Sequence, residues 1–256
     1  MEIGRKRVFL DSIDSTNSYA ISLAEKGYPH GTIVVADKQT AGRGRHGRLW
    51  HSPPKKNIYM SIILRPHRGA LRNLSLLTLM AAVAFSEAIK FKTSIPVRVK
   101  WPNDLMVFCG RDFKKVGGIL SEARFIGGDL EFAIIGVGIN VNSLDADFPP
   151  DLLNSAASLR MASAGDIDRD DLIEGLLVSL NKWYDTLLDG QDHLILKRWR
   201  EISLTLGRDV AVTVREAHPE VIKGMAMDID NEGRLLLSLP SGRIKRIESG
   251  DVVHLR

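Results

Sequence analysis

The sequence changes character at Gly207, and this change constrains the fold more than any other feature. Before it, segments with helical periodicity alternate with short β-branched segments, whereas after it short strand-like segments follow one another between Gly-containing turns. Short strands with frequent turns and no helix are typical of a small β-barrel. We therefore expect an α+β fold, with a mixed β-sheet flanked by helices over residues 1–206 and a small C-terminal β-barrel domain over residues 207–256.

Local patterns predict the elements of both domains. Ser15, Thr16 and Asn17 are good N-cap residues before an apolar segment that stops at Gly27, which predicts the first helix. Further helices are expected at residues 73–88, 168–188 and 194–202. Strands are expected at residues 7–13, 32–36, 57–64, 97–100, 105–108, 116–124 and 130–139, and in the C-terminal domain at residues 210–214, 222–227 and 234–239.

Composition narrows the class of protein. With 256 residues, 44% of them hydrophobic, the chain can bury a core, and its one cysteine, Cys109, excludes an internal disulfide. The longest apolar run, residues 74–85, is expected to be too short to cross a bilayer. The first residues do not have the pattern of a signal peptide, so we expect a cytoplasmic protein with no membrane partner.

Positive charge is concentrated in one part of the sequence. The formal net charge is only +4, but no Asp or Glu occurs between Lys38 and Ser86, where nine Lys and Arg residues lie. Acidic residues gather instead between Asp145 and Asp192. We therefore expect one region of the protein to bind anions.

The centre of this basic region is the segment GRGRHGR at residues 42–48. It fits the G-x-G-x-x-G pattern of dinucleotide-binding folds, but Pro53 and Pro54 follow where that pattern requires a helix. It nearly fits the P-loop pattern too, but Arg48 and Leu49 replace the lysine and the hydroxyl residue. A flexible basic loop remains, whose glycines let backbone amides approach an anion and whose arginines offer forked donors to phosphate. A solvated surface loop or a nonspecific RNA contact is the alternative.

Three more segments combine polar residues with turns or glycines. KWPND at residues 100–104 holds Lys100, Asn103 and Asp104 in a fixed relation at a strand end. Lys115 opens an expected strand whose next residues, Gly117 and Gly118, leave a bare surface against which a ligand can lie flat. The segment at residues 136–142 is a buried strand that ends in amides. Each segment also has an ordinary explanation, as a turn, an exposed strand-end lysine and a glycine-relieved core strand.

Together and in this order, these segments resemble the biotin protein ligase family, which joins biotin to a lysine of carrier domains. The similarity runs from about Val8 to Asn142, and the small C-terminal β-module also matches. It implies a class II synthetase-like catalytic domain followed by an SH3-like barrel. The segments that carry it are Ser15-Thr16-Asn17, QTAGRGRHGR at residues 39–48, Trp50, KWPND at residues 100–104, KVGGIL at residues 115–120 and GVGIN at residues 136–140.

The resemblance implies a reaction in two steps. The carboxylate of biotin attacks the α-phosphorus of ATP to give biotinyl-5′-AMP and pyrophosphate, and the amine of a carrier lysine then attacks the mixed anhydride. ATP and biotin are the implied substrates, Mg²⁺ the implied metal ion, and a biotin carboxyl carrier protein or carrier domain of a biotin-dependent carboxylase the implied partner. Because no DNA-reading segment precedes Arg7, we expect a monofunctional ligase without specific DNA binding, as a monomer or homodimer.

The resemblance also implies roles for single residues. Lys115 is expected between the biotin carboxylate and the α-phosphate, Trp50 on the adenine, and Arg43 and Arg45 in a loop that folds over the intermediate. The implied catalytic residues are Lys115, Arg45 and Asp104, with Asp104 also able to steer the carrier amine. The implied biotin-binding residues are Ser15, Thr16, Asn17, Gln39, Arg43, Gly44, Arg45, Lys115, Gly117 and Gly118, with Met60 or Ser61 in addition; the implied ATP-binding residues are Arg43, Arg45, Arg48, Trp50, Lys100, Asn103 and Asn140; no side chain is assigned as a direct metal ligand.

Two other functions compete with this interpretation. A lipoate or octanoate ligase or transferase has a related fold, but such proteins lack the GRGRxG loop. The octanoyl transferase also needs a positioned cysteine, and Cys109 lies in an expected turn. A basic nucleic-acid-binding module is the other alternative, but an apolar strand and helix follow the arginines, with no interleaved aromatic platform.

Overall fold

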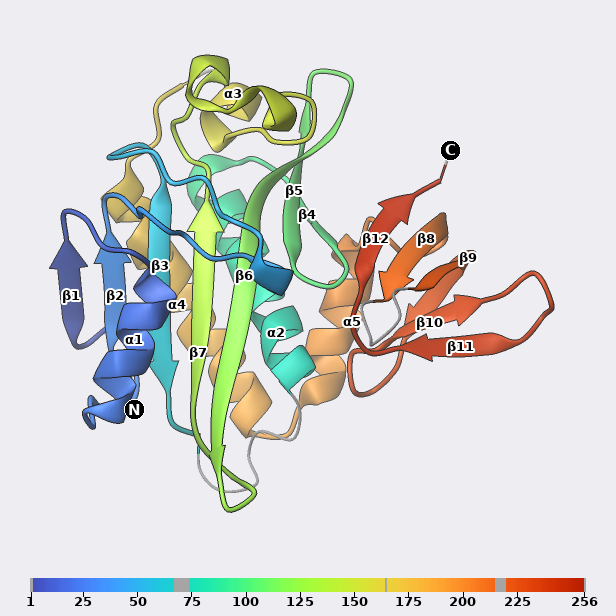
Figure 1. Ribbon diagram of the computed structural model, residues 1–256, viewed down its shortest axis with the longest axis horizontal. Coiled ribbons are helices and arrows are strands. Elements are labelled where there is room, and N and C mark those ends of the chain that lie inside the picture. Colours follow the sequence, from blue (N-terminus) through green and yellow to red (C-terminus); the bar gives the residue numbers. More distant parts are fainter. Residues whose placement is uncertain (1, 67–73, 164, 215–219, 256) are drawn as a thin grey trace.

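The larger part of the molecule is built on a seven-stranded mixed sheet (Figure 1). The computed structural model describes residues 2–66, 74–163, 165–214 and 220–255. The strand order is β1-β2-β3-β7-β6-β5-β4, with β1 and β2 parallel and all other neighbours antiparallel. The strands are β1 (Arg7–Leu10), β2 (Ile33–Ala36), β3 (Ile58–Leu64), β4 (Val97–Lys100), β5 (Asp104–Cys109), β6 (Asp112–Ile126) and β7 (Asp129–Ile139).

Helices cover the two faces of this sheet unequally. Figure 1 shows α1 (Thr16–Glu25) on the face toward the viewer and α2 (Leu74–Thr93), α4 (Arg169–Leu188) and α5 (Asp192–Ile202) behind it. The main hydrophobic core lies between the sheet and these three helices, and a smaller one lies under α1. A short helix, α3 (Leu159–Ser163), follows the loop after β7. The face that carries α1 is therefore left partly open, and the cavity described below lies there.

Helix α2 corrects one expectation. The helix was expected to end at residue 88, but it continues to Thr93. Within it, the Thr78 hydroxyl donates to Leu74 O and the Ser86 hydroxyl donates to Val97 O. The helix spans 20 residues and is, by length and composition alone, long and apolar enough to cross a membrane, whereas the expectation from sequence concerned only the shorter run at residues 74–85. In the structure, 67% of its most apolar window is buried, and it packs against α4, α5 and β6.

The C-terminal part forms a separate antiparallel sheet with the order β11-β10-β9-β8-β12. Sequence patterns predict three of its strands but miss β11 and β12, whose short alternations include charged residues. Trp101 joins this sheet to the larger one, since its indole Nε1 donates to Gly233 O at 3.1 Å. The strands are β8 (Asp209–Val214), β9 (Glu220–Ile229), β10 (Leu235–Ser238), β11 (Ile244–Ile247) and β12 (Asp251–His254). The expected α+β class, with a mixed sheet and a small β-module, is confirmed.

Strands β6 and β7 form one long hairpin, as the glycines at 127 and 128 predict. Strand β6 begins at Asp112, so Lys115 lies inside this strand and does not open it, contrary to the expectation from sequence. The strand starts earlier because Gly110, with φ of +70°, makes a tight connection from β5. The pleat then turns Gly118, Leu120 and Glu122 toward the α1 face.

Candidate active site

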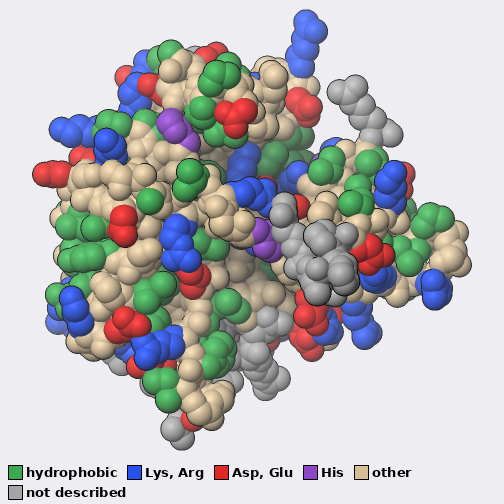
Figure 2. Space-filling model, in the orientation of Figure 1, with side chains coloured by type: hydrophobic (Ala, Val, Ile, Leu, Met, Phe, Trp, Pro, Cys, Tyr) green, Lys and Arg blue, Asp and Glu red, His purple; other side chains and the backbone are tan. Residues whose placement is uncertain are grey.

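A cavity of about 610 Å³ opens between the sheet, the loop after β2 and the C-terminal module. This volume lies within the range of small-molecule sites. Figure 2 shows Lys and Arg side chains gathered at the hollow between the two parts of the molecule. Gly117 is absent from the lining, because its missing side chain would point toward Gly138 O and Leu105. The other implied site residues line the cavity together: Ser15, Thr16, Asn17, Gln39, Arg43, Gly44, Arg45, Arg48, Trp50, Lys100, Asn103, Asp104, Lys115, Gly118 and Asn140.

Neutral polar groups form one end of the cavity, at the start of α1. Ser15 caps the helix, and Thr16 and Asn17 follow in its first turn, each about 4% exposed. Ser61 Oγ of β3 lies 2.8 Å from Thr16 Oγ1 and 2.6 Å from Asn17 Oδ1. Ser61 thus supports this end from behind, whereas Met60, the other residue considered from sequence, is buried in the main core. The arrangement suits an uncharged polar ligand.

Gln39 holds the loop after β2 against this end. Its Oε1 accepts from Thr16 N at 2.9 Å, and its Nε2 donates to Ser52 Oγ at 3.0 Å. The side chain therefore organises the cavity wall with both ends of its amide.

Glycines in β6 and β7 make room for two side chains of the site. A Cβ on Gly136 would lie 1.9 Å from Asn17 Oδ1, and a Cβ on Gly138 would lie 2.4 Å from Trp50 Nε1. A Cβ on Gly118 would lie 3.3 Å from the Trp50 ring. The surface that sequence predicts for a ligand is therefore covered by the indole of Trp50, which lies over Gly118 and Gly138.

The indole of Trp50 is held by shape more than by polar contacts. Its Nε1 is buried with no hydrogen-bond partner among the described residues. Lys115 Nζ lies 5.3 Å from the ring centroid, within the range of a cation–π contact.

The GRGRHGR segment folds as a tight hairpin. Gly44 N donates to Arg48 O at 2.7 Å, Trp50 N donates to Gly42 O at 2.8 Å, and Arg43 and Leu49 form a bridge. Gly47 has φ of +73°, a backbone conformation that favours glycine at the turn. We call residues 42–50 the arginine loop.

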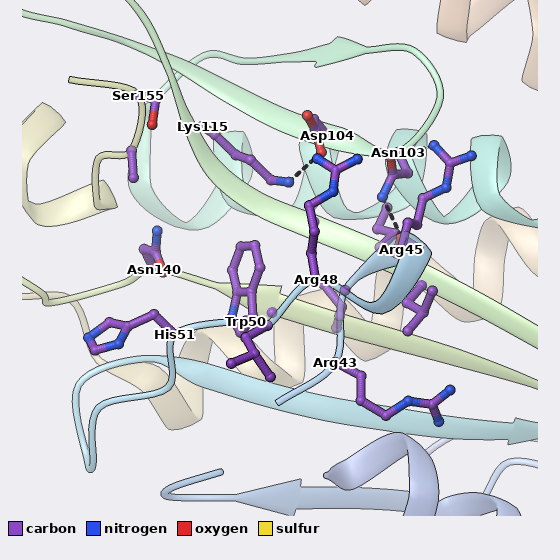
Figure 3. Close-up of a pocket in the computed structure, with 18 of the residues that line it drawn as sticks. Arg43, Arg45, Arg48, Trp50, His51, Asn103, Asp104, Lys115, Asn140 and Ser155 are labelled. Carbon is purple, nitrogen blue, oxygen red and sulfur yellow. Dashed lines mark hydrogen bonds and ion pairs between the residues drawn. The ribbon is translucent and has the colours of Figure 1, made fainter. Parts of the chain in front are cut away.

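The three arginine side chains of the loop extend in different directions (Figure 3), and each has a different partner. Arg43 Nη2 forms an ion pair of 2.7 Å with Glu122 of β6, and Arg48 pairs with Asp251 of β12. Arg45 Nη2 donates to Ser249 Oγ at 2.7 Å. These partners offset the mutual repulsion of the arginines that the sequence suggests.

Arg45 is the most enclosed of the three. Its Nη1 donates to Gly250 O at 3.2 Å and lies 3.4 Å from Asn103 Oδ1. Burial lowers the pKa of its guanidinium, and the carboxylates of Asp251 and Asp104 oppose that shift. The turn between β11 and β12 therefore closes one side of the cavity over the arginine loop.

Lys115 and Asp104 form an ion pair in the cavity, with Nζ and Oδ1 2.6 Å apart (Figure 3). The residues lie on neighbouring strands, where a bulge between Leu105 and Met106 shifts the register of β5 against β6. Lys100 is close by in β4, and burial lowers the pKa of its amine while Asp104 opposes the shift. Two ammonium groups and one carboxylate thus converge where an anionic ligand would be neutralised.

Asn103 and Asn140 have separate positions. Asn103 Nδ2 donates to Ile119 O at 2.8 Å, which leaves its oxygen directed to Arg45. Asn140 Nδ2 donates to Ala157 O at 3.1 Å at the other end of the cavity, near His51 in Figure 3. Both residues were expected at the site from the sequence, but their hydrogen-bond partners were not.

Several residues of the site escape sequence reasoning. One of them is Glu122, which pairs with Arg43. The sequence could have indicated it, because Gly118, Leu120 and Glu122 are spaced by two residues and therefore lie on the same face of the strand. Residues 251–253 of β12 also line the cavity, as do Phe148, Leu152, Asn154, Ser155 and Ala156, and only tertiary structure brings them there. Cys109 does not line the cavity; its sulfur lies 3.8 Å from Met161 O.

Two family models match the chain. That of the biotin/lipoate A/B protein ligase family covers residues 9–140, and that of the biotin protein ligase C terminal domain covers residues 205–255. The chain belongs to the biotin/lipoate A/B protein ligase family. The resemblance to biotin protein ligases noted from the sequence is thereby confirmed, and the arginine loop, Trp50, Lys115 and Asn140 lie within the part matched to this ligase family.

Individual ligases of the family are similar over most of the chain. A bifunctional ligase/repressor BirA from Bacillus spizizenii is 39% identical over 250 residues, which cover 98% of this chain and 74% of that protein. A biotin–[acetyl-CoA-carboxylase] ligase from Mycobacterium tuberculosis is 32% identical, over 94% of this chain and 86% of that protein. Among solved structures, a biotin protein ligase from Aquifex aeolicus in complex with biotin and ATP has a TM-score of 0.81 and 31% identity, covering 98% of this chain and 99% of that one.

Proposed function

We propose that this protein is an ATP-dependent ligase that converts biotin to biotinyl-5′-AMP and transfers it to a lysine of a biotin carrier protein. The observation that supports it best is the composition of one continuous cavity. A neutral hydrogen-bonding end at Asn17 leads to a cationic centre at Lys115, beside an aromatic plate at Trp50. A cyclic urea, an α-phosphate and a purine need these environments in this order.

The uncharged end binds the ureido ring of biotin in this proposal. Thr16, Asn17 and Gln39 carry both donors and acceptors without formal charge, so they can recognise a neutral polar ring without the cost of burying an ion. Their mutual hydrogen bonds hold them in place before the ligand arrives. Pre-organisation of this kind reduces the entropy lost on binding.

Lys115 brings the two reacting anions together. The biotin carboxylate and the α-phosphate repel one another, and an ammonium group between them lowers the energy of the approach and of the charged transition state. Asp104 holds the Lys115 amine through their ion pair, and Arg45 and Arg48 meet the phosphates from the loop side. Attack of a carboxylate oxygen on the α-phosphorus then expels pyrophosphate.

The arginine loop protects the intermediate from water. A mixed anhydride hydrolyses readily, and exclusion of water by a closed loop prevents that side reaction. In the second step of this proposal Asp104 accepts a proton from the carrier lysine ammonium, and the resulting amine attacks the acyl carbon and expels AMP. The adenine stacks on Trp50, with Asn140 at the same end.

Mg²⁺ is expected to arrive with the triphosphate. The described part of the chain holds no group of three His, Cys, Asp or Glu side chains that could bind a metal ion. Mg²⁺ commonly uses one or two carboxylates together with substrate phosphates and water, and Asp104 and Asp251 are the carboxylates among the described residues that line the cavity. The ion would supply neutralisation of phosphate charge.

Other parts of the proposal concern the setting of the enzyme. A domain boundary near Leu206 is supported by backbone bonds, because Leu204 N donates to Val99 O in the first sheet and Gly207 N donates to Ala226 O in the second. A cytoplasmic location agrees with one unpaired cysteine. The partner is a carrier domain of a carboxylase, and either a monomer or a homodimer would present the cavity.

The deciding experiment is ATP–pyrophosphate exchange with and without biotin. We expect exchange that requires biotin and Mg²⁺, followed by label transfer to a carrier domain. Equal exchange with lipoate or octanoate would refute the biotin assignment. Octanoyl transfer through a cysteine is disfavoured because Cys109 lies outside the cavity. A sequence-specific DNA footprint that survives physiological salt would contradict the expected absence of specific DNA binding.

A further inference from the structure

Glu122 connects two parts of the site that are far apart in sequence. Its Oε2 accepts from Asn17 Nδ2 at 2.8 Å, and its Oε1 accepts from Arg43 Nη2 at 2.7 Å. Its side chain is 25% exposed, so solvent screens these contacts only in part. One carboxylate therefore holds both the neutral end of the cavity and the arginine loop.

The contact with Asn17 decides which way the amide faces. An ionised carboxylate accepts hydrogen bonds but donates none, so Nδ2 must point to Glu122 and Oδ1 away from it. The oxygen then lies 2.6 Å from Ser61 Oγ and over Gly136. Leu120 O, 3.3 Å from Nδ2, favours the same orientation.

The contact with Arg43 holds the loop on the sheet. Besides Glu122, the Arg43 guanidinium contacts only the Ser18 hydroxyl, at 3.4 Å, among the described residues. Its neighbours Arg45 and Arg48 are bound instead to the C-terminal module. Glu122 is therefore the acidic group that joins the loop to the strand bearing Lys115.

We propose that Glu122 is a positioning residue that couples filling of the biotin pocket to closure of the arginine loop. This inference rests on the proposed function. Biotin bound at Asn17 adds contacts to the already oriented amide, which strengthens its hydrogen bond to the Glu122 carboxylate and, through it, the ion pair that holds Arg43 in the closed position. Because coupling between two equilibria is reciprocal, closure of the loop tightens biotin binding by the same factor.

The test uses trypsin on the full chain, which cleaves an open loop after Arg45 and Arg48. We expect biotin alone to slow this cleavage by at least about 5-fold in the wild type, the lower end of typical coupling factors. In Glu122→Gln, which keeps the size but loses the charge, biotin should slow it by less than about 2-fold, and the Kd for biotin should rise by at least about 5-fold. The matched control is Glu174→Gln, since Glu174 binds Arg7 through both oxygens away from the cavity and should behave as the wild type.

A double variant separates coupling from a structural role. If Glu122 acts through Arg43, the Glu122→Gln change should lower biotin-dependent protection of the loop in the wild type but have almost no further effect in Arg43→Gln. Additive effects, or unchanged protection in Glu122→Gln, would overturn the coupling while leaving the ligase proposal intact. A wild-type chain that neither binds biotin nor supports exchange would instead overturn the proposed function, and the coupling with it.

Discussion

The substitution Gly138→Ala tests whether Trp50 is the platform for adenine. The added Cβ would lie 2.4 Å from Nε1 and 2.5 Å from Cε2 of the indole, whereas ordinary contacts are 3.4–4 Å. The ring must therefore move by about 1 Å, so that the distance from the added Cβ to Nε1 increases from 2.4 Å to the 3.4 Å of an ordinary contact. The cavity gives it space to lift, so we expect the strand to keep its place.

A lifted indole no longer stacks in the same plane. Base–aromatic stacking contributes about 1–3 kcal/mol, so the Kd for ATP should rise roughly 5- to 150-fold. The Kd for biotin should change by less than about 2-fold, because Asn17 and Gln39 lie at the other end of the cavity. Equilibrium titration with a nonhydrolysable ATP analogue, followed by indole fluorescence, measures the first value, and titration with biotin measures the second.

Two other glycines provide the controls. Gly136→Ala should show the opposite selectivity, because its Cβ would lie 1.9 Å from Asn17 Oδ1 and should weaken biotin. Gly165→Ala should leave both affinities unchanged, since no atom lies within 4 Å of the added carbon. Unchanged ATP affinity in Gly138→Ala, or an equal loss of ATP and biotin affinity, would refute the role assigned to Trp50.

Four further outcomes are expected. Lys115→Ala should slow single-turnover adenylate formation by orders of magnitude without changing the circular dichroism spectrum, and near-normal formation would remove it from the mechanism. Arg45→Gly should release biotinyl-5′-AMP into solution faster than it slows its formation, as rapid filtration can measure; a retained intermediate would speak against a closing loop. Burial lowers the pKa of His254 to about 4, so the folded state binds fewer protons than the unfolded state above that value, and stability should fall as pH drops from about 6.5 to 4. In His254→Gln the urea midpoint of unfolding should depend less on pH over this range. A pH profile identical to that of the wild type would contradict the assignment of this dependence to His254. Trp101→Phe leaves Gly233 O without its donor, so the free energy of unfolding should fall by about 1–3 kcal/mol, and an unchanged urea midpoint would show that the contact contributes nothing.

Strongly patterned segments made much of the fold predictable. The N-cap residues before α1, the glycine pair between β6 and β7 and the long apolar run of α2 each determine a local structure that the rest of the chain does not override. Strands β11 and β12 were not predicted from the sequence, because each has only four residues of mixed polarity and adopts its conformation by pairing with β10 and β8.

The site was predictable where a motif carries its own geometry. Lys115 and Asn103 were expected at the site because their segments resemble those of the biotin protein ligase family, and both line the cavity. The contact partners of the site residues could not be predicted, because contacts such as Arg45 with Ser249 or Arg43 with Glu122 depend on how separate elements pack. Gly118 shows the same limit: a bare surface at Gly117 and Gly118 was expected from the sequence, but not that Trp50 would cover Gly118.

The contact between Arg45 and Ser249 can form only late in the synthesis of the chain. The two residues are 204 positions apart, so 204 further residues must be translated after Arg45 before this partner exists. At about 5–20 residues per second, this translation takes roughly 10–40 s. During it, Lys115 and Asp104 have already emerged, but the wall formed by β12 has not. Until Ser249 and Gly250 are made, Arg45 therefore lacks the contacts that hold it at this side of the cavity.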